Sequence, residues 1–210
     1  MLYNLVNDFD GRYDMKRERV YEIFSNIPTL RTERLSLRAM HPIDAEDMYD
    51  YARREDVTKY LTWNPHTSVS YTKDYLRYVH NRYTFGDFYD WAVIERESRR
   101  MIGTCGFTSI DTANNSAEIG YVINPDFHGR GLGSEAVQRI IEFGFGELGL
   151  NRIQARFMQG NLPSKRLMER VGMTFEGYAR SAVYVKGAYR TVGICSVLRE
   201  EWEASRGNMV

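Results

Sequence analysis

Apolar residues recur along the chain in two kinds of pattern from residue 30 onward. Alternation in RLSLRAM over 34–40 predicts a strand. Apolar residues at helical spacing then predict helices in 44–56 and 71–83, with Ser70 as the N-cap of the second. Strand-like runs at 88–95, 101–110 and 117–123 are separated by polar turns at 97–100 and 111–115, which predicts an antiparallel meander.

The second half of the chain alternates between helices and strands. A helix from Ser134, a strand at Arg152–Met158, a helix at Ser164–Val171 and strands at Tyr178–Val185 and Thr191–Leu198 complete the pattern. The expected order is strand, two helices, three strands, helix, strand, helix and two strands. Separate meander and crossover units predict an α/β fold of the α+β type, with a mixed sheet rather than a doubly wound parallel one.

The residues before this pattern form a polar and aromatic arm. A short helical stretch at Arg17–Phe24 is followed by Pro28, which separates the arm from the rest. We therefore expect an N-terminal arm over 1–29, a single domain over 30–204 and a C-terminal tail over 205–210. The arm can cap the domain or exchange with a neighbouring subunit, so a homodimer is one expectation.

Charge and composition limit the class of partner. The 210 residues include 28 Lys and Arg and 28 Asp and Glu, so the formal net charge is zero, which argues against a general nucleic-acid binder. No apolar run approaches the roughly 20 residues that span a bilayer, and Asp8, Asp10 and Asp14 interrupt the region where a signal peptide needs an apolar core. We expect a cytoplasmic protein with no membrane partner.

The two cysteines do not suggest a metal site. Cys105 and Cys195 lie in separate apolar runs, and the sequence contains neither a CxxC nor an HExxH motif. Both are expected to be small buried residues, and no metal is expected.

A glycine-rich turn carries the clearest functional signal. Gly129, Gly131 and Gly133 alternate just before an apolar helix, and Ser134 follows them. Free N–H groups at the start of a helix bind anions, and glycines let a ligand approach the backbone closely. A diphosphate is the natural ligand, although a glycine-rich turn with no ligand remains an alternative. The P-loop and dinucleotide patterns both fail here, because Ser134-Glu135 follows where they require Lys or a third glycine.

The segments around this turn resemble a known superfamily. The stretch HGRGLGSEA, preceded by EIGYVINPDF and followed by NLPSKRLMERVGMTFEG, together with the opening LRTERLSLR, is similar to the GNAT acyl-CoA N-acyltransferases. The branch that it resembles contains the ribosomal-protein N-terminal acetyltransferases RimJ and RimL. The resemblance spans roughly Leu30 to Trp202, and His128 departs from the Gln or Arg that the superfamily's loop usually begins with.

The resemblance implies a GNAT-like fold with a splayed central sheet and acetyl-CoA as cosubstrate. The strand at 121–123 would diverge from the strand at 152–158, the pantetheine arm would lie in the gap, and the amides of 129–134 would hold the pyrophosphate. The implied cofactor-binding residues are Tyr121, Val122, Ile123, His128, Gly129, Arg130, Gly131, Leu132, Gly133, Ser134, Asn161 and Ser164.

Asn161 and Ser164 match the superfamily's Asn-x-x-Ser, which contacts coenzyme A, although a helix N-cap explains Asn161 equally well. Arg130, Lys165 and Arg166 are candidates for the ribose phosphate, and a solvated surface charge is the alternative for each.

Acetyl transfer to an amine requires removal of a proton from the amine and donors for the oxyanion and the thiolate. Glu118 is the candidate base, because burying an unpaired carboxylate in an apolar strand is costly and a catalytic role would account for it. An ion pair with an arginine across the sheet is the alternative. The resemblance makes Tyr184 the candidate acid, with Ser164 as a rival donor and aromatic packing as the alternative for Tyr184.

The sequence thus predicts an N-acetyltransferase that moves an acetyl group from acetyl-CoA to a primary amine by direct attack in a ternary complex. The acceptor is a protein N-terminus or a small-molecule amine, and Tyr60 and Trp63 are expected near it, as an amine pocket or as packing. A non-catalytic acyl-CoA-binding regulatory module is the alternative, and a scaffold with a degenerate glycine loop is a third reading.

Overall fold

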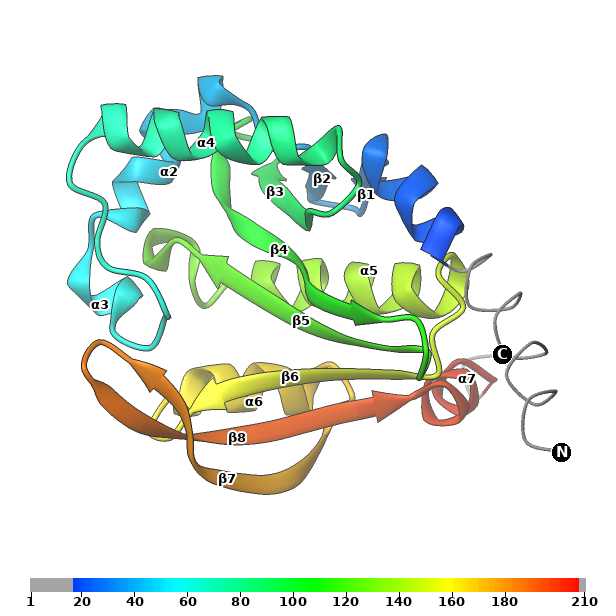
Figure 1. Ribbon diagram of the computed structural model, residues 1–210. Coiled ribbons are helices and arrows are strands. Elements are labelled where there is room, and N and C mark those ends of the chain that lie inside the picture. Colours follow the sequence, from blue (N-terminus) through cyan, green and yellow to red (C-terminus); the bar gives the residue numbers. More distant parts are fainter. Residues whose placement is uncertain (1–16, 208–210) are drawn as a thin grey trace, which may run out of the picture.

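The computed structural model describes residues 17–207, and its framework is one eight-stranded sheet (Figure 1). The strand order is β1-β2-β3-β4-β5-β6-β8-β7. The strands are β1 (Leu30–Arg31), β2 (Leu35–Arg38), β3 (Tyr89–Glu95), β4 (Met101–Asp111), β5 (Ser116–Ile123), β6 (Arg152–Met158), β7 (Thr174–Val185) and β8 (Ala188–Leu198). Neighbouring strands are antiparallel except β5 and β6, which confirms the predicted mixed sheet.

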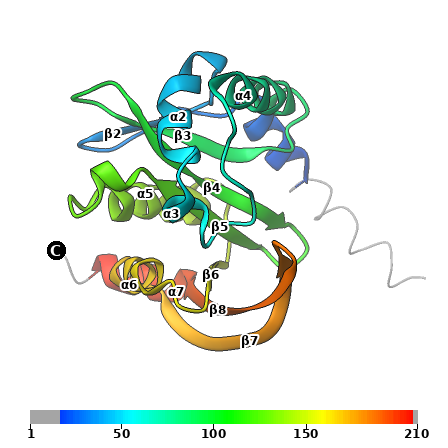
Figure 2. The ribbon, with the colours of Figure 1, turned by 90° about the vertical axis from the view of Figure 1, so that its left-hand side faces the viewer.

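Helices cover both faces of the sheet (Figure 2). A helix at 17–25 precedes β1. The others are η1 (Pro42–Asp44), α2 (Ala45–Ala52), α3 (Glu55–Thr58), α4 (Val69–Tyr83), η2 (Pro125–Phe127), α5 (Leu132–Gly146), α6 (Leu162–Arg170) and α7 (Arg199–Gly207). The predicted N-cap Ser70 is wrong. Ser68 caps α4 instead, because its side chain accepts a hydrogen bond from the Tyr71 amide.

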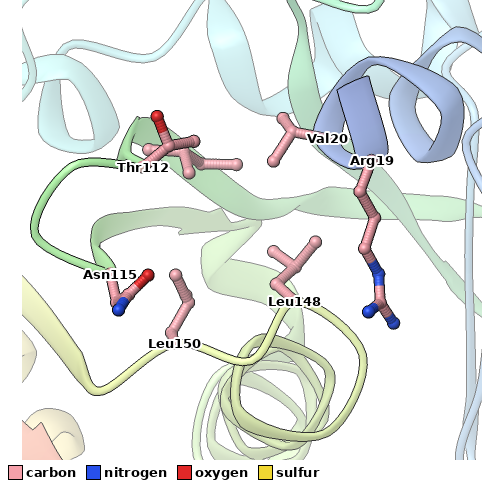
Figure 3. Close-up of a pocket in the computed structure, with 7 residues that line it drawn as sticks. Arg19, Val20, Thr112, Asn115, Leu148 and Leu150 are labelled. Carbon is pink, nitrogen blue, oxygen red and sulfur yellow. The ribbon is translucent and has the colours of Figure 1, made fainter. Parts of the chain in front are cut away.

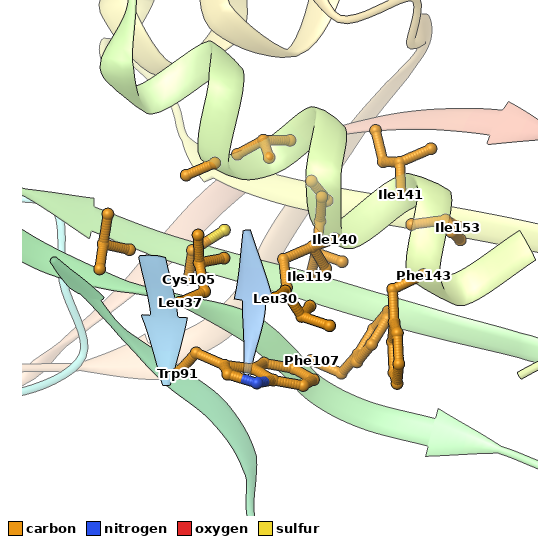
Figure 4. Packing of buried hydrophobic residues seen from close by; sticks show 14 of the residues in the cluster. Leu30, Leu37, Trp91, Cys105, Phe107, Ile119, Ile140, Ile141, Phe143 and Ile153 are labelled. Atoms are coloured by element: carbon orange, nitrogen blue, oxygen red, sulfur yellow. The ribbon is translucent and has the colours of Figure 1, made fainter. Parts of the chain in front are cut away.

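The larger core lies between the sheet and α5, and Figure 4 shows its centre. Phe24, from the helix at 17–25, is fully buried there and meets Trp91 and Phe143 edge-to-face at centroid distances of 5.5 and 6.3 Å. The described part of the predicted arm is therefore packed into the same core as the strands. Residues 1–16 of that arm lie outside the described residues.

The smaller core lies on the opposite face of the sheet, under α2 and α4. Tyr51 and Leu76 from these helices pack there with Ala92 and Ile94 of β3. Successive side chains on a strand point to opposite faces of the sheet. The two cores therefore show which residues of each strand face α5 and which face α2 and α4.

The sheet divides where β5 and β6 separate. The two strands pair in parallel from Ser116 and Arg152 only as far as Ile119 and Ala155. Beyond that point, β5 continues beside β4 to Ile123, and β6 continues beside β8 to Met158. The remaining part of β5, Gly120–Ile123, thus has no strand partner on its β6 side. The predicted splay of the central sheet is present.

Candidate active site

A cleft of about 590 Å³ opens where β5 and β6 diverge. Its walls come from α3 and the segment after it, the end of β5, the turn from Pro125 to Ser134, and the first turns of α6. Every predicted cofactor-binding residue except Arg130 lines this cleft: Tyr121, Val122, Ile123, His128, Gly129, Gly131, Leu132, Gly133, Ser134, Asn161 and Ser164. The structure therefore gathers in one place residues that are spread over some forty positions of the chain.

The glycine turn presents bare backbone to the cleft. Gly129 and Gly131 have φ angles of +75° and +76°, a region that disfavours side chains, and a Cβ at Gly129 would meet nothing within 4 Å. Gly131 is the N-cap of α5, and the first hydrogen bond within the helix runs from the Glu135 amide to the Gly131 carbonyl. The amides just before Glu135 have no acceptor within the helix, so they are free to bind an anion.

Ser134 adds a polar group with an unmet hydrogen-bond requirement. Its side-chain oxygen is buried and has no hydrogen-bond partner, although the residue lines the cleft. Leaving a buried hydroxyl unpaired costs about 1–3 kcal/mol. An acceptor atom arriving from the cleft would remove that cost, and a phosphate oxygen beside the start of α5 fits this requirement.

A network of side chains braces the glycine turn from the opposite side. Glu135 accepts hydrogen bonds from the Thr32 hydroxyl at 2.5 Å and from the Arg34 amide at 2.9 Å, and it pairs with the Arg34 guanidinium at 2.6 Å. Burial alone would raise the pKa of Glu135, but these hydrogen bonds lower it below its ordinary value. Arg34 also donates to the carbonyl of Arg130 at 2.8 Å, so it ties the turn to the β1–β2 connection.

The side chain of Arg130 faces away from the cleft. It pairs with the buried carboxylate of Glu95 at 2.5 Å and does not line the cleft. The expectation that this side chain meets the ribose phosphate is therefore not supported by its position. His128 does line the cleft, and its Nε2 donates to the carbonyl of Ile123 at 2.8 Å, which fastens the turn to the end of β5.

Two hydroxyl groups meet at the start of α6. Asn161 is the N-cap of this helix, because its side-chain oxygen accepts the Ser164 amide at 3.3 Å. The Ser164 hydroxyl lies 2.9 Å from the Tyr121 hydroxyl of β5. Burial raises the pKa of Tyr121, and the hydrogen bond with Ser164 only partly opposes this. Tyr121 therefore keeps its proton at neutral pH.

Two arginines of α6 also line the cleft. Arg166 was expected there, and Arg170 was missed, although it lies one helical turn further on the same face. That spacing is the signal that could have identified it. Lys165 is directed elsewhere: it pairs with Glu169 at 3.5 Å and lies 4.4 Å from the centroid of the Phe175 ring.

Glu118 is ion-paired and stands outside the cleft lining. Its carboxylate meets the Arg156 guanidinium at 2.7 Å and accepts from Gln154 at 3.1 Å and from Thr108 at 3.3 Å. The side chain is 13% exposed. An ion pair with an arginine across the sheet, the alternative to an unpaired carboxylate, is what the structure contains.

Tyr184 and Trp63 also lie apart from the cleft lining. Tyr184 is 65% exposed on β7, with its ring 5.1 Å from that of Tyr189. Trp63 packs beside the core under α4, whereas Tyr60 does line the cleft. Of the two candidate proton donors, the structure brings only Ser164 to the place where the strands diverge.

A second cavity lies under the helix at 17–25 (Figure 3). It measures about 20 Å³ and is lined by residues such as Val20, Thr112 and Leu148. A volume of this size holds about one water molecule, so it cannot take a substrate.

Residues 17–207 contain no group of three or more side chains arranged to hold a metal ion. Cys105 and Cys195 are buried free thiols, and burial raises the pKa of both. Within the same residues, no helix is both long and apolar enough to span a bilayer.

Comparison with known proteins gives one consistent family. The family described as "Acetyltransferase (GNAT) domain" matches residues 34–174. The "Uncharacterized N-acetyltransferase p20" of Bacillus licheniformis is 38% identical over 174 residues, which cover 83% of this chain and 98% of that protein. The "[Ribosomal protein uS5]-alanine N-acetyltransferase" of Escherichia coli is 26% identical over 191 residues, covering 87% of this chain and 97% of the relative.

Solved structures agree with the sequence relatives. A crystal structure of an acetyltransferase of the GNAT family from Bacillus anthracis superposes with a TM-score of 0.73 at 28% identity. The match covers 82% of this chain and 99% of that one.

Proposed function

This chain belongs to the GNAT acetyltransferase family, and from that premise we propose that it transfers an acetyl group from acetyl-CoA to a primary amine within a ternary complex. The observation that carries the proposal is the cleft at the divergence of β5 and β6. The first turn of α5, which includes the unpartnered Ser134 hydroxyl, lines this cleft.

The chain's own residues would hold acetyl-CoA in three ways. The amides around Gly131 and the Ser134 hydroxyl would bind the diphosphate. The unpaired edge of β5 over 120–123 would donate to and accept from the amide groups of the pantetheine arm. Arg166 and Arg170, one turn apart on α6, would bind the remaining phosphate.

When bound, acetyl-CoA supplies a thioester carbonyl carbon as the acceptor of the amine's lone pair. The amine nitrogen bonds to that carbon, and the carbon–sulfur bond breaks. The hydroxyl pair of Ser164 and Tyr121 is placed to give a proton to the departing sulfur. Glu118 would take the amine's proton through solvent, since it stands outside the cleft lining. Tyr184 is the weaker candidate for the acid, because it is exposed on β7.

The acceptor is a protein N-terminus or a small-molecule amine. The Escherichia coli relative is named for the alanine of a ribosomal protein, and a relative from Vibrio cholerae, 23% identical, is named for spermidine. Both names describe acetylation of an amine, which supports the reaction class.

The test combines turnover with coenzyme A binding. The protein should release free thiol from acetyl-CoA only when a suitable amine is present. Ser134→Ala should weaken coenzyme A binding measured by calorimetry by roughly 10- to 150-fold, because a hydrogen bond to a charged group is worth about 1.5–3 kcal/mol. It should not lower the stability of the ligand-free protein, in which this hydroxyl has no partner.

The control variant is Ser205→Ala, whose hydroxyl only bonds to the Trp202 carbonyl on α7. The proposal is wrong if no amine in a broad panel supports thiol release, or if Ser134→Ala and Ser205→Ala bind coenzyme A equally well.

A further inference from the structure

One row of residues crosses three strands on the face of the sheet that α2 and α4 cover. Asp90 of β3 lies opposite Gly106 of β4, and Gly106 lies opposite Gly120 of β5. Ala92, two residues along from Asp90, belongs to the core under α2 and α4, so the row faces the same side. Two of its three members have no side chain, which leaves Asp90 as the functional group of the row.

The Asp90 carboxylate has no cationic partner among residues 17–207. It accepts the Trp91 amide at 3.0 Å and a hydrogen bond from Thr104, and it lies directly over Gly106, where a Cβ would come within 2.8 Å of its oxygen. Glu118, on the same face, is paired with Arg156. Asp90 is thus a largely enclosed carboxylate whose charge the described residues leave uncompensated, which is costly.

A second unmet polar group lies within electrostatic reach of this carboxylate. Tyr51 of α2 is 1% exposed, and its hydroxyl has no hydrogen-bond partner. Burial, the neighbouring Tyr75 and then Asp90 raise the pKa of Tyr51, and Asp90 likewise raises the pKa of Tyr75 of α4 after burial. The unpaired carboxylate of Asp90 therefore favours a ligand that carries positive charge and donates hydrogen bonds.

The glycines connect this position to the proposed site of acetyl transfer. Gly120 follows directly on Ile119, where β5 and β6 stop pairing. A Cβ at Gly120 would meet only the methyl group of Thr108 within 4 Å, so the space over Gly120 is bounded on one side alone. Neighbouring strands are about 4.8 Å apart, which places Asp90 about 10 Å across the sheet from the divergence.

We propose that Asp90 binds a second ammonium group of the acceptor, and that the acceptor is an aliphatic di- or polyamine that reaches Asp90 over Gly120. One amine would reach the divergence of β5 and β6 while the other is held on β3. The assignment rests on the proposed acetyl transfer, because it names the acceptor for that site.

The experiment compares 1,5-diaminopentane with pentylamine, which has the same carbon chain and lacks the second amine. Wild-type protein should use the diamine with a kcat/KM about 10-fold or more above that of the monoamine, since one charged hydrogen bond is worth about 1.5–3 kcal/mol. In Asp90→Asn this ratio should fall to near one, mainly through the KM for the diamine. Calorimetry in the presence of coenzyme A should show the same loss of diamine binding.

Asp74→Asn is the matched control, because Asp74 is a 65% exposed carboxylate on α4 that pairs only with Arg77. It should keep the wild-type ratio. Three results would each overturn the assignment of the acceptor while leaving the proposed acetyl transfer intact. Wild-type protein could use both amines equally well, or it could prefer a peptide N-terminus followed by an uncharged side chain to the diamine. The ratio could also stay unchanged in Asp90→Asn. Absence of thiol release with every amine would remove the proposed function, and the acceptor assignment with it.

Discussion

Asp90 makes a pH-dependent contribution to stability that can be measured without any substrate. Burial raises the pKa of Asp90 from its ordinary value of 3.8 to about 7, although hydrogen bonds from Thr104 and the Trp91 amide oppose the shift. The native protein therefore holds this proton more tightly than the unfolded chain does. Stability from Asp90 is present below about pH 4 and is lost as the pH rises to about 7.

The size of the effect follows from the shift. About three pKa units correspond to at most about 4 kcal/mol. Because Asp90 keeps some solvent contact, we expect roughly half of this, about 2 kcal/mol. Asn at this position does not titrate and still offers an oxygen to the Trp91 amide. Asp90→Asn should therefore gain about 2 kcal/mol in unfolding free energy, relative to wild type, between about pH 4 and about pH 7.

Urea denaturation followed by circular dichroism measures these free energies. Both proteins share every other titrating group, so the difference between their two pH profiles isolates position 90. Asp74→Asn should run parallel to wild type, because that carboxylate is exposed. Profiles of Asp90→Asn and wild type that stay parallel within about 0.5 kcal/mol would refute the reasoning.

Five other substitutions test the remaining features. Glu118→Gln should lower turnover at neutral pH and less so at high pH, and an unchanged pH–rate profile would exclude Glu118 as the base. Ser164→Ala should lower kcat by about 10-fold or more, whereas Tyr184→Phe should lie within about 2-fold of wild type; the reverse order in a steady-state assay would favour Tyr184 as the acid. Glu135→Gln should raise the KM for acetyl-CoA several-fold with little change in kcat, because the braced turn loosens; a change in kcat alone would contradict this. Phe24→Ala should cost about 3–5 kcal/mol in urea denaturation, and a cost below about 1 kcal/mol would mean that its helix contributes little to the core.

The lining of the cleft around the starts of α5 and α6 could be predicted because its signals are local. Alternating glycines before an apolar helix predict an anion site within a few residues, and Asn161 with Ser164 forms a cap that is readable from spacing. The mixed sheet followed from the order of strand and helix patterns. Ser68 replaced Ser70 as the N-cap because choosing between two nearby serines depends on where the first helical turn begins.

The features that the sequence did not reveal depend on contacts between distant segments. Glu135 meets Arg34 across 101 positions, and Arg130 meets Glu95, which removes its side chain from the cleft. The partner of Glu118 could be named only as an arginine across the sheet until the pairing of β5 with β6 placed Arg156 beside it. The sequence did not indicate that the Asp90 carboxylate lacks a cationic partner, because this depends on the register of β3, β4 and β5.

The burial of Phe24 also has a consequence for synthesis of the chain on the ribosome. Phe24 packs against Phe143, which is translated about 120 residues later. At about 5–20 residues per second, the helix at 17–25 waits roughly 6–24 s for α5 to be made. During that interval Trp91 is already made, but the contact with Phe143 of α5 is missing, so the apolar face of this early helix stays partly uncovered. A nascent chain of this protein therefore offers chaperones a hydrophobic target near its start until the core is complete.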